Sequence, residues 1–248
     1  MLLSGVVAIV LLLWFFWPEK GVLALLSKVR RNNQRVLLED ALKYMFDCEY
    51  RSKPCDINGL AGNLNISADK TSVLLERLLS MGLIRLVDDT VTLSDSGRSY
   101  ALRVIRVHRI WESYLAEETG LEPAEWHQEA DTLEHQVKQK ETEELAAKMG
   151  HPVFDPHGDP IPTSDGELPG LKGKPLHRMN KGEIGRISHI EDEPRNIYEQ
   201  LVVQGLYPGM QVYVTDAAEN KIVFVADGDE CTLTSLFASH ITVELMEE

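Results

Sequence analysis

Residues 108–135 of this 248-residue chain, HRIWESYLAEETGLEPAEWHQEADTLEH, constrain its fold more than any other stretch. We interpret them as two helical segments joined by a turn over residues 120–123, which contain Gly and Pro. Polar side chains recur at helical spacing, four apart before the turn and at i, i+4, i+7 and i+8 after it: His108, Glu112, His127, Asp131, Glu134 and His135. Such spacing places side chains on one helix face. Imidazoles and carboxylates that converge in this way are typical of divalent-cation ligation, because a metal offsets their repulsion. The alternative is a surface helix on which these residues share a face by chance.

The segment before this stretch has the element order of a winged helix. Apolar spacing predicts helices over residues 36–48 and 57–64, and Ser67 caps a third helix over residues 68–81 that ends at Gly82. Residues 83–93 alternate and turn at Asp88 and Asp89, which is typical of a hairpin. In a winged helix-turn-helix the third helix lies in the major groove of DNA. A helical packing module that never contacts DNA is the alternative.

The third helix offers polar side chains to phosphates and base edges: Ser67, Lys70, Thr71, Ser72 and Arg77. Asp69 and Glu76 lie on the same helix and would repel phosphates. The net charge of -14 is unevenly spread, since residues 20–109 carry 15 basic and 10 acidic side chains and residues 110–248 carry 10 and 28. This asymmetry favours a DNA-facing first half and an acidic sensor half.

The first 17 residues, MLLSGVVAIVLLLWFFW, are apolar apart from Ser4 and are predicted to form a membrane anchor. At about 1.5 Å per residue such a helix reaches roughly 25 Å, close to a hydrocarbon core of about 30 Å. Basic residues between 28 and 35 would hold the following chain in the cytoplasm. A cleaved signal or a misassigned start is the alternative, but no basic residue precedes the apolar run. We therefore expect a single-pass protein of the cell membrane with cytoplasmic regulatory domains.

The C-terminal half begins with an irregular loop, residues 151–175, that is dense in Pro and Gly. Its polar side chains invite a second metal hypothesis, although a structural belt is the favoured interpretation: His151, Asp155, His157 and Asp159. Residues 176–245 then alternate in short strands around a helix over residues 196–204. The three cysteines are scattered without a CxxC motif, which argues for a reducing compartment and against a zinc finger.

Residues 108–135, together with the loop HPVFDPHGDPIP at 151–162, resemble the iron-dependent repressor family of the diphtheria toxin repressor and manganese transport regulator type. The resemblance runs from about residue 33 to the C-terminus. It implies a homodimer with two metal sites per subunit. The implied primary set is Asp40, Asp131, Glu134 and His135, and the implied ancillary set is His108, Glu112 and His127. In longer members the C-terminal domain adds ligands, for which Glu191 and Glu193 are nearby acids.

The ligands are all nitrogen and oxygen donors, which suits Mn2+ or Fe2+, with Mn2+ favoured. Residues 176–245 resemble the ferrous-iron-transport A type of SH3-like barrel. The N-terminal segment looks like the last helix of a metal ABC-transporter permease, so such a transporter is a further candidate partner.

We therefore expect a mainly α protein with small β elements. Its expected domains are a transmembrane anchor (1–27), a winged helix-turn-helix (28–106), a metal-binding and dimerisation domain (107–163), a linker (164–175) and an SH3-like barrel (176–248). The expected function is metal-dependent repression of metal-uptake genes by binding a double-stranded operator. The alternative is a membrane-anchored metal sensor that regulates a transporter without binding specific DNA. No nucleophile with a partnered base is evident, so an enzyme is not expected.

Overall fold

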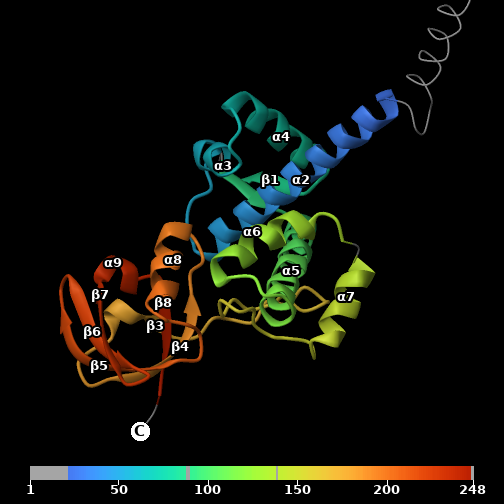
Figure 1. Cartoon of the computed structure of the whole chain (residues 1–248). Coiled ribbons are helices and arrows are strands. Elements are labelled where there is room, and N and C mark those ends of the chain that lie inside the picture. The colour runs from blue at the N-terminus through green and yellow to red at the C-terminus, as the bar shows by residue number, and fades with distance from the viewer. Residues whose placement is uncertain (1–21, 88–89, 138, 247–248) are drawn as a thin grey trace, which may run out of the picture. The chain divides into compact units, whose positions relative to one another are not determined.

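The computed structural model describes residues 22–87, 90–137 and 139–246, and the chain divides into two compact units, Met1–Ala101 and Leu102–Glu248. The described part of the first unit contains α2 (Val22–Tyr50), α3 (Ile57–Asn63), α4 (Ala68–Ser80), β1 (Ile84–Val87) and β2 (Thr90–Leu93), as Figure 1 shows. Helix α5 (Asp95–Glu118) begins in this unit and continues into the second. The order of three helices and a hairpin is the one that the sequence predicts.

The residues at the two ends of α4 explain why the sequence predicts the bounds of this helix. The Ser67 hydroxyl caps it by accepting a hydrogen bond from the Lys70 amide at 3.4 Å. At the other end Gly82 has a φ of +69°, a conformation that ends helices at low cost only for glycine. One face of the helix is buried: Thr71, Leu74, Leu75 and Leu78. The opposite face is exposed.

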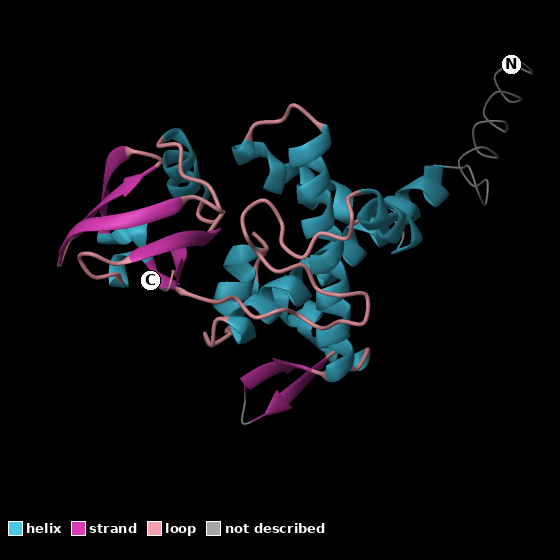
Figure 2. Cartoon of the chain, turned by 90° about the horizontal axis from the view of Figure 1, so that it is seen from below, coloured by secondary structure: helices cyan, strands magenta, loops and turns pink. Residues whose placement is uncertain are grey.

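Strand β1 pairs with β2 in an antiparallel hairpin (Figure 2). Helix α5 starts very close to this hairpin. A Cβ on Gly97 would lie 1.8 Å from the carbonyl oxygen of Leu83, so no other residue fits there without a shift of the backbone. The glycine therefore fixes how α5 leaves the hairpin.

Helix α2 is longer than predicted, since it begins at Val22 rather than at residue 36. Residues 28–35 are mostly polar and show no apolar periodicity, so apolar spacing does not predict the earlier turns of the helix. The expected boundary between residues 27 and 28 consequently falls inside one helix. The predicted anchor, residues 1–17, lies outside the described residues. None of the helices in the described ranges has both the length and the apolar character needed to span a bilayer.

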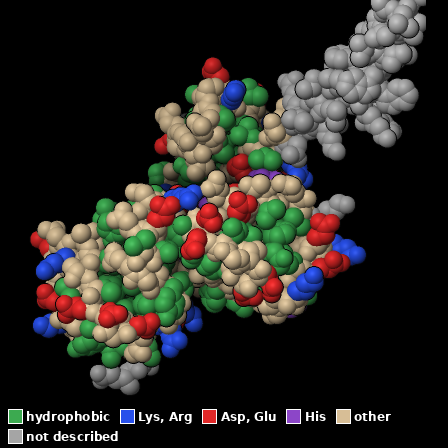
Figure 3. All heavy atoms as spheres, viewed as in Figure 1, with side chains coloured by type: hydrophobic (Ala, Val, Ile, Leu, Met, Phe, Trp, Pro, Cys, Tyr) green, Lys and Arg blue, Asp and Glu red, His purple; other side chains and the backbone are tan. Residues whose placement is uncertain are grey.

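The second unit begins with the rest of α5, followed by α6 (Pro123–Glu134) and α7 (Gln139–Lys148). Pro123 starts α6, where its missing N–H is tolerated, and the turn before it lies where the sequence predicted. Ile110, Ala146 and Ile161 form a small buried cluster that joins α5, α7 and the following loop. Acidic side chains are spread over the face of this unit seen in Figure 3, in keeping with its sequence.

The C-terminal part of this unit is a six-stranded antiparallel sheet in the order β3-β8-β4-β5-β6-β7. Its elements are β3 (Lys174–Pro175), η1 (Leu176–Arg178), β4 (Ile184–Ile190), α8 (Arg195–Val203), β5 (Gln211–Ala218), β6 (Lys221–Ala226), β7 (Asp229–Thr234), α9 (Ser235–Ala238) and β8 (Ile241–Leu245). Leu201 of α8 is buried in the same core as Ile187 and Phe224 of the sheet. Strand β7, DECTLT, was not predicted because only Leu233 on it is buried.

Candidate metal centre

Two helices and two loops of the second unit bring imidazoles and carboxylates together. Helix α5 carries His108 and Glu112, four residues apart on one face, and both are buried. Helix α6 carries His127 and Asp131 at the same spacing. Asp192 joins them from the loop between β4 and α8.

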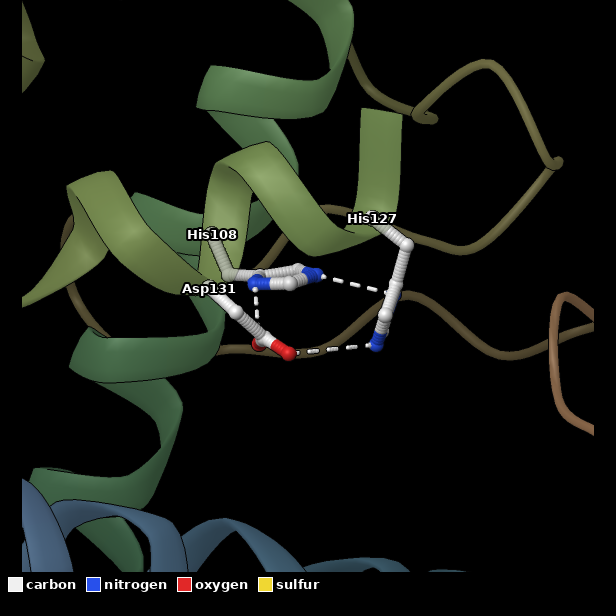
Figure 4. A group of neighbouring side chains, drawn as sticks. All are labelled: His108, His127 and Asp131. Carbon is white, nitrogen blue, oxygen red and sulfur yellow. Dashed lines mark hydrogen bonds and ion pairs between the residues drawn. The ribbon is translucent and has the colours of Figure 1, made fainter. Parts of the chain in front are cut away.

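The first group of potential ligands is His108, His127 and Asp131 (Figure 4). Nε2 of His108 lies 3.3 Å from Nδ1 of His127, and Nδ1 of His108 lies 3.3 Å from Oδ1 of Asp131. The His127 Nε2 lies 3.6 Å from Oδ2 of Asp131. One ligand atom from each of the three residues can be chosen so that all three atoms lie within 4.8 Å of one another, which makes the group a candidate for one cation.

The second group is Glu112, His127 and Asp192. His127 Nδ1 lies 2.6 Å from Oδ2 of Asp192 and 3.1 Å from Oε1 of Glu112. The sequence had suggested Glu191 and Glu193 as nearby acids, but the residue between them is the one that meets His127. Only the tertiary fold distinguishes these three acids, because all of them follow the same strand.

His157 is a further member, which the sequence indicates only as part of a second metal hypothesis for the loop of residues 151–175. Its ring is buried, and neither ring nitrogen has a hydrogen-bond partner within the described part of the chain. Nε2 of His157 lies 3.6 Å from Oε1 of Glu112. Burial of an imidazole without a hydrogen-bond partner costs free energy, so we expect a bound group to contact the ring at this position. The unpartnered nitrogens and the nearby carboxylate are the ligand chemistry that a cation would satisfy.

The backbone at His157 and Gly158 lies directly against strand β4. The Ile190 amide donates to the His157 carbonyl at 2.9 Å. At Gly158, where φ is +91°, a Cβ would lie 2.0 Å from the Ser188 carbonyl oxygen. These contacts hold the loop against β4 at His157. This fixed path agrees with the belt interpretation of the loop, but it also holds an imidazole at the cluster.

Of the other residues predicted to bind metal, Glu134 and His135 lie at the end of α6. Oε2 of Glu134 lies 2.6 Å from Nδ1 of His108, and Oε1 lies 3.3 Å from Nε2 of His135. Asp40 lies within α2 in the first unit. Its part in a site with residues of the second unit stays a prediction.

The electrostatics of this cluster favour a protonated His127. Burial opposes the charged form of His127, but hydrogen bonds to Asp192 and Glu112 raise its pKa to about 10. Burial likewise favours the protonated form of Glu112, yet the imidazoles of His108 and His127 hold the pKa of this carboxyl well below its ordinary value. The buried carboxyl of Glu112 is therefore charged and depends on positive partners.

The residues predicted to contact DNA lie on α4 of the first unit. Lys70 and Ser72 are exposed, as is the N-cap residue Ser67. Nη1 of Arg77 donates to the Gln34 side chain at 2.9 Å. Thr71 is fully buried, and its hydroxyl donates to the Ser67 carbonyl at 3.1 Å. Thr71 therefore cannot contact DNA, because it belongs to the buried row of the helix.

The chain is similar to known proteins over most of its length. The profile of the iron-dependent repressor, metal binding and dimerisation domain matches residues 94–163, and the FeoA domain matches residues 174–245. The iron-dependent repressor IdeR of Mycobacterium bovis is 27% identical over 200 residues, covering 75% of this chain and 86% of IdeR. A solved manganese-dependent transcriptional repressor in complex with manganese is 30% identical, with a TM-score of 0.74 over 83% of this chain and 100% of that one. The chain belongs to the iron-dependent repressor family.

Membership in the repressor family corrects the predicted location at the cell membrane. IdeR and the diphtheria toxin repressor, which match about three quarters of the chain, are named as repressors, and none of the helices described here could cross a membrane. A probable metal transport system membrane protein of Chlamydia trachomatis is 32% identical over 85 residues, but these are only 19% of that protein. The membrane and the transporter are thus not supported as partners. Repressor relatives agree with the expectation that the chain is not an enzyme.

Proposed function

We propose that this protein is a Mn2+- or Fe2+-dependent transcriptional repressor that binds an operator as a homodimer. The observation that carries the proposal is the convergence of imidazoles and carboxylates from α5, α6 and two loops of the second unit, of which His108, Glu112 and His157 are buried. Repression is supported by the repressor relatives, and dimerisation by the matched family domain.

The cluster supports an ancillary site built from His108, Glu112 and His127, as the family resemblance implied. Asp192 and His157 would complete it, since one lies 2.6 Å from His127 and the other 3.6 Å from Glu112. The proposed primary site keeps Asp131, Glu134 and His135 from α6 and its C-cap, together with Asp40 from α2. No thiolate belongs to either set, which supports Mn2+ or Fe2+ over softer ions.

The metal would supply positive charge in place of the proton on His127. A ligand set drawn from both units would order one unit relative to the other when it is filled. The strength of such a switch cannot exceed the difference in metal affinity between the ordered and unordered states. Operator binding would then depend on the metal through the orientation of α4.

The exposed carboxylates of Asp69 and Glu76 on α4 favour a second candidate, a metal sensor that binds no specific DNA. Gel-shift titration at low salt separates the two functions. We expect the purified protein to retard an operator fragment with Mn2+ or Fe2+ present and not with a chelator. A protein that binds these ions tightly but retards no genomic fragment under either condition would exclude the repressor and leave the sensor.

A further inference from the structure

Val73 occupies the centre of the exposed face of α4. Its residue exposure is 66%, the highest of the large apolar residues described in the first unit. Asp69 precedes it by four residues and Glu76 follows it by three, so these side chains form one row. That row lies opposite the buried row of Thr71, Leu74, Leu75 and Leu78.

Local stability gives no reason for a valine at this position. A β-branched residue is a poorer helix former than Ala by roughly 0.5 kcal/mol, and an exposed side chain recovers little of this by packing. Single exposed apolar residues are common on protein surfaces, so exposure alone proves nothing. The position of Val73 is the informative part, because the third helix of a winged helix presents this face to DNA.

The neighbours of Val73 determine which part of DNA the row can face. Carboxylates at Asp69 and Glu76 would be repelled by phosphates, so the row cannot lie along the backbone. It can face base edges, where an acidic side chain accepts a hydrogen bond from the cytosine amino group. Lys70 is exposed on one flank and Ser72 on the other, which suits contacts to the phosphates on either side.

Valine has no hydrogen-bonding group, so it can distinguish bases only by apolar contact. The 5-methyl group of thymine is the apolar group that the major groove presents. We infer that Val73 is a specificity-determining residue that contacts a thymine methyl group in each half of the operator. This inference rests on the proposed function, because it requires a protein that binds duplex DNA through α4.

The test begins with selection of bound duplexes from a random pool by the full-length protein in excess Mn2+. Each thymine of the selected sequence is then replaced in turn by deoxyuridine, which pairs identically but lacks the methyl group. We expect one thymine per half-site at which this change weakens binding by wild-type protein ~4-fold, the value of one buried methyl-sized group. The Val73→Ala variant should bind the thymine and deoxyuridine duplexes equally.

Val203→Ala is the matched control, since Val203 is also an exposed helical valine, at 87% exposure, on α8. It should keep the full preference for thymine. Far-UV circular dichroism checks that Val73→Ala folds, as expected for an exposed helical position. A selected operator with no thymine at which wild type and Val73→Ala differ would overturn this inference alone. Failure to select any sequence would overturn the proposed function and this inference with it.

Discussion

Nδ1 of His127 on α6 lies 2.6 Å from a carboxylate oxygen of Asp192, in the loop that follows β4. The two residues belong to the segments matched by different family domains, the metal-binding and dimerisation domain and the FeoA domain. The candidate metal centre therefore contains residues from both segments. The loop that follows β4 of the C-terminal sheet therefore contributes a side chain to the cluster.

Replacement of Asp192 tests whether the C-terminal segment supplies a ligand. We expect Asp192→Ala to lower the affinity for Mn2+ by at least about tenfold, because it removes a carboxylate at hydrogen-bond distance from His127. Competition with a fluorescent chelator measures the change. Glu193→Gln is the control, since Glu193 is exposed and is the adjacent acid. Equal losses in both variants would indicate a general charge effect and no direct ligand.

Metal binding should release a proton from His127. The hydrogen bonds to Asp192 and Glu112 raise its pKa to about 10 against the opposing effect of burial, so the metal-free ring is protonated at neutral pH. A metal binds only the neutral ring. The apparent affinity should therefore rise as the pH increases from 6.5 to 8.5. Titration calorimetry in buffers of different ionisation enthalpy counts the released protons, and a His127→Gln variant should release fewer.

The same pKa shift makes a prediction for the metal-free protein. A pKa raised from 6.5 to about 10 means that the charged ring stabilises the fold fully below pH 6.5 and loses this contribution as the pH rises through 10. Urea unfolding in the presence of a chelator, compared with the same series for His127→Gln, isolates the contribution. A pH dependence identical in the two proteins would contradict the ion pair with Asp192.

Arg109 should be a major determinant of stability in the second unit. Its guanidinium donates to the Pro160 carbonyl at 2.6 Å and to Asp159 at 3.1 Å, and Asp159 also meets Nε2 of His189 at 3.2 Å. Arg109→Ala leaves the half-buried carboxylate of Asp159 without this cation, which costs about 3 kcal/mol, the lower end for a buried pair, because both side chains keep some exposure. Urea unfolding of the metal-free protein measures this loss. The exposed Arg178→Ala is the control, and a loss no larger than that of the control would show that the network is not structural.

Gly158→Ala should perturb metal binding through the loop that carries His157. A methyl group there would lie 2.0 Å from the Ser188 carbonyl oxygen, whereas nothing lies within 4 Å of the same position at Gly166. Both glycines have positive φ, 91° and 85°, so both variants carry strain of about 1–3 kcal/mol. Only Gly158→Ala should also lower Mn2+ affinity. Equal Mn2+ affinities in the two variants would indicate that His157 does not contribute to metal binding.

The sequence predicts those parts of the site that depend on local spacing. His108 with Glu112 and His127 with Asp131 were identified because i and i+4 residues share a helix face in any fold. Asp192 was not, because it lies in a loop far from these helices in the sequence and no periodicity marks it. His157 was named only for a second metal hypothesis in its own loop, because the sequence does not show that this loop reaches the cluster. Thr71 was wrongly assigned to DNA, since the buried face of a short helix is fixed by what packs against it.

His108 has a carboxylate at each ring nitrogen, Glu112 at 3.0 Å from Nε2 and Glu134 at 2.6 Å from Nδ1. A cation that takes Nε2 forces the remaining proton onto Nδ1, where it must point at Glu134. Binding of a cation at Nε2 of His108 would then change the hydrogen bond that the same ring makes with Glu134. The binding of one ion would consequently change the affinity of the protein for a second ion.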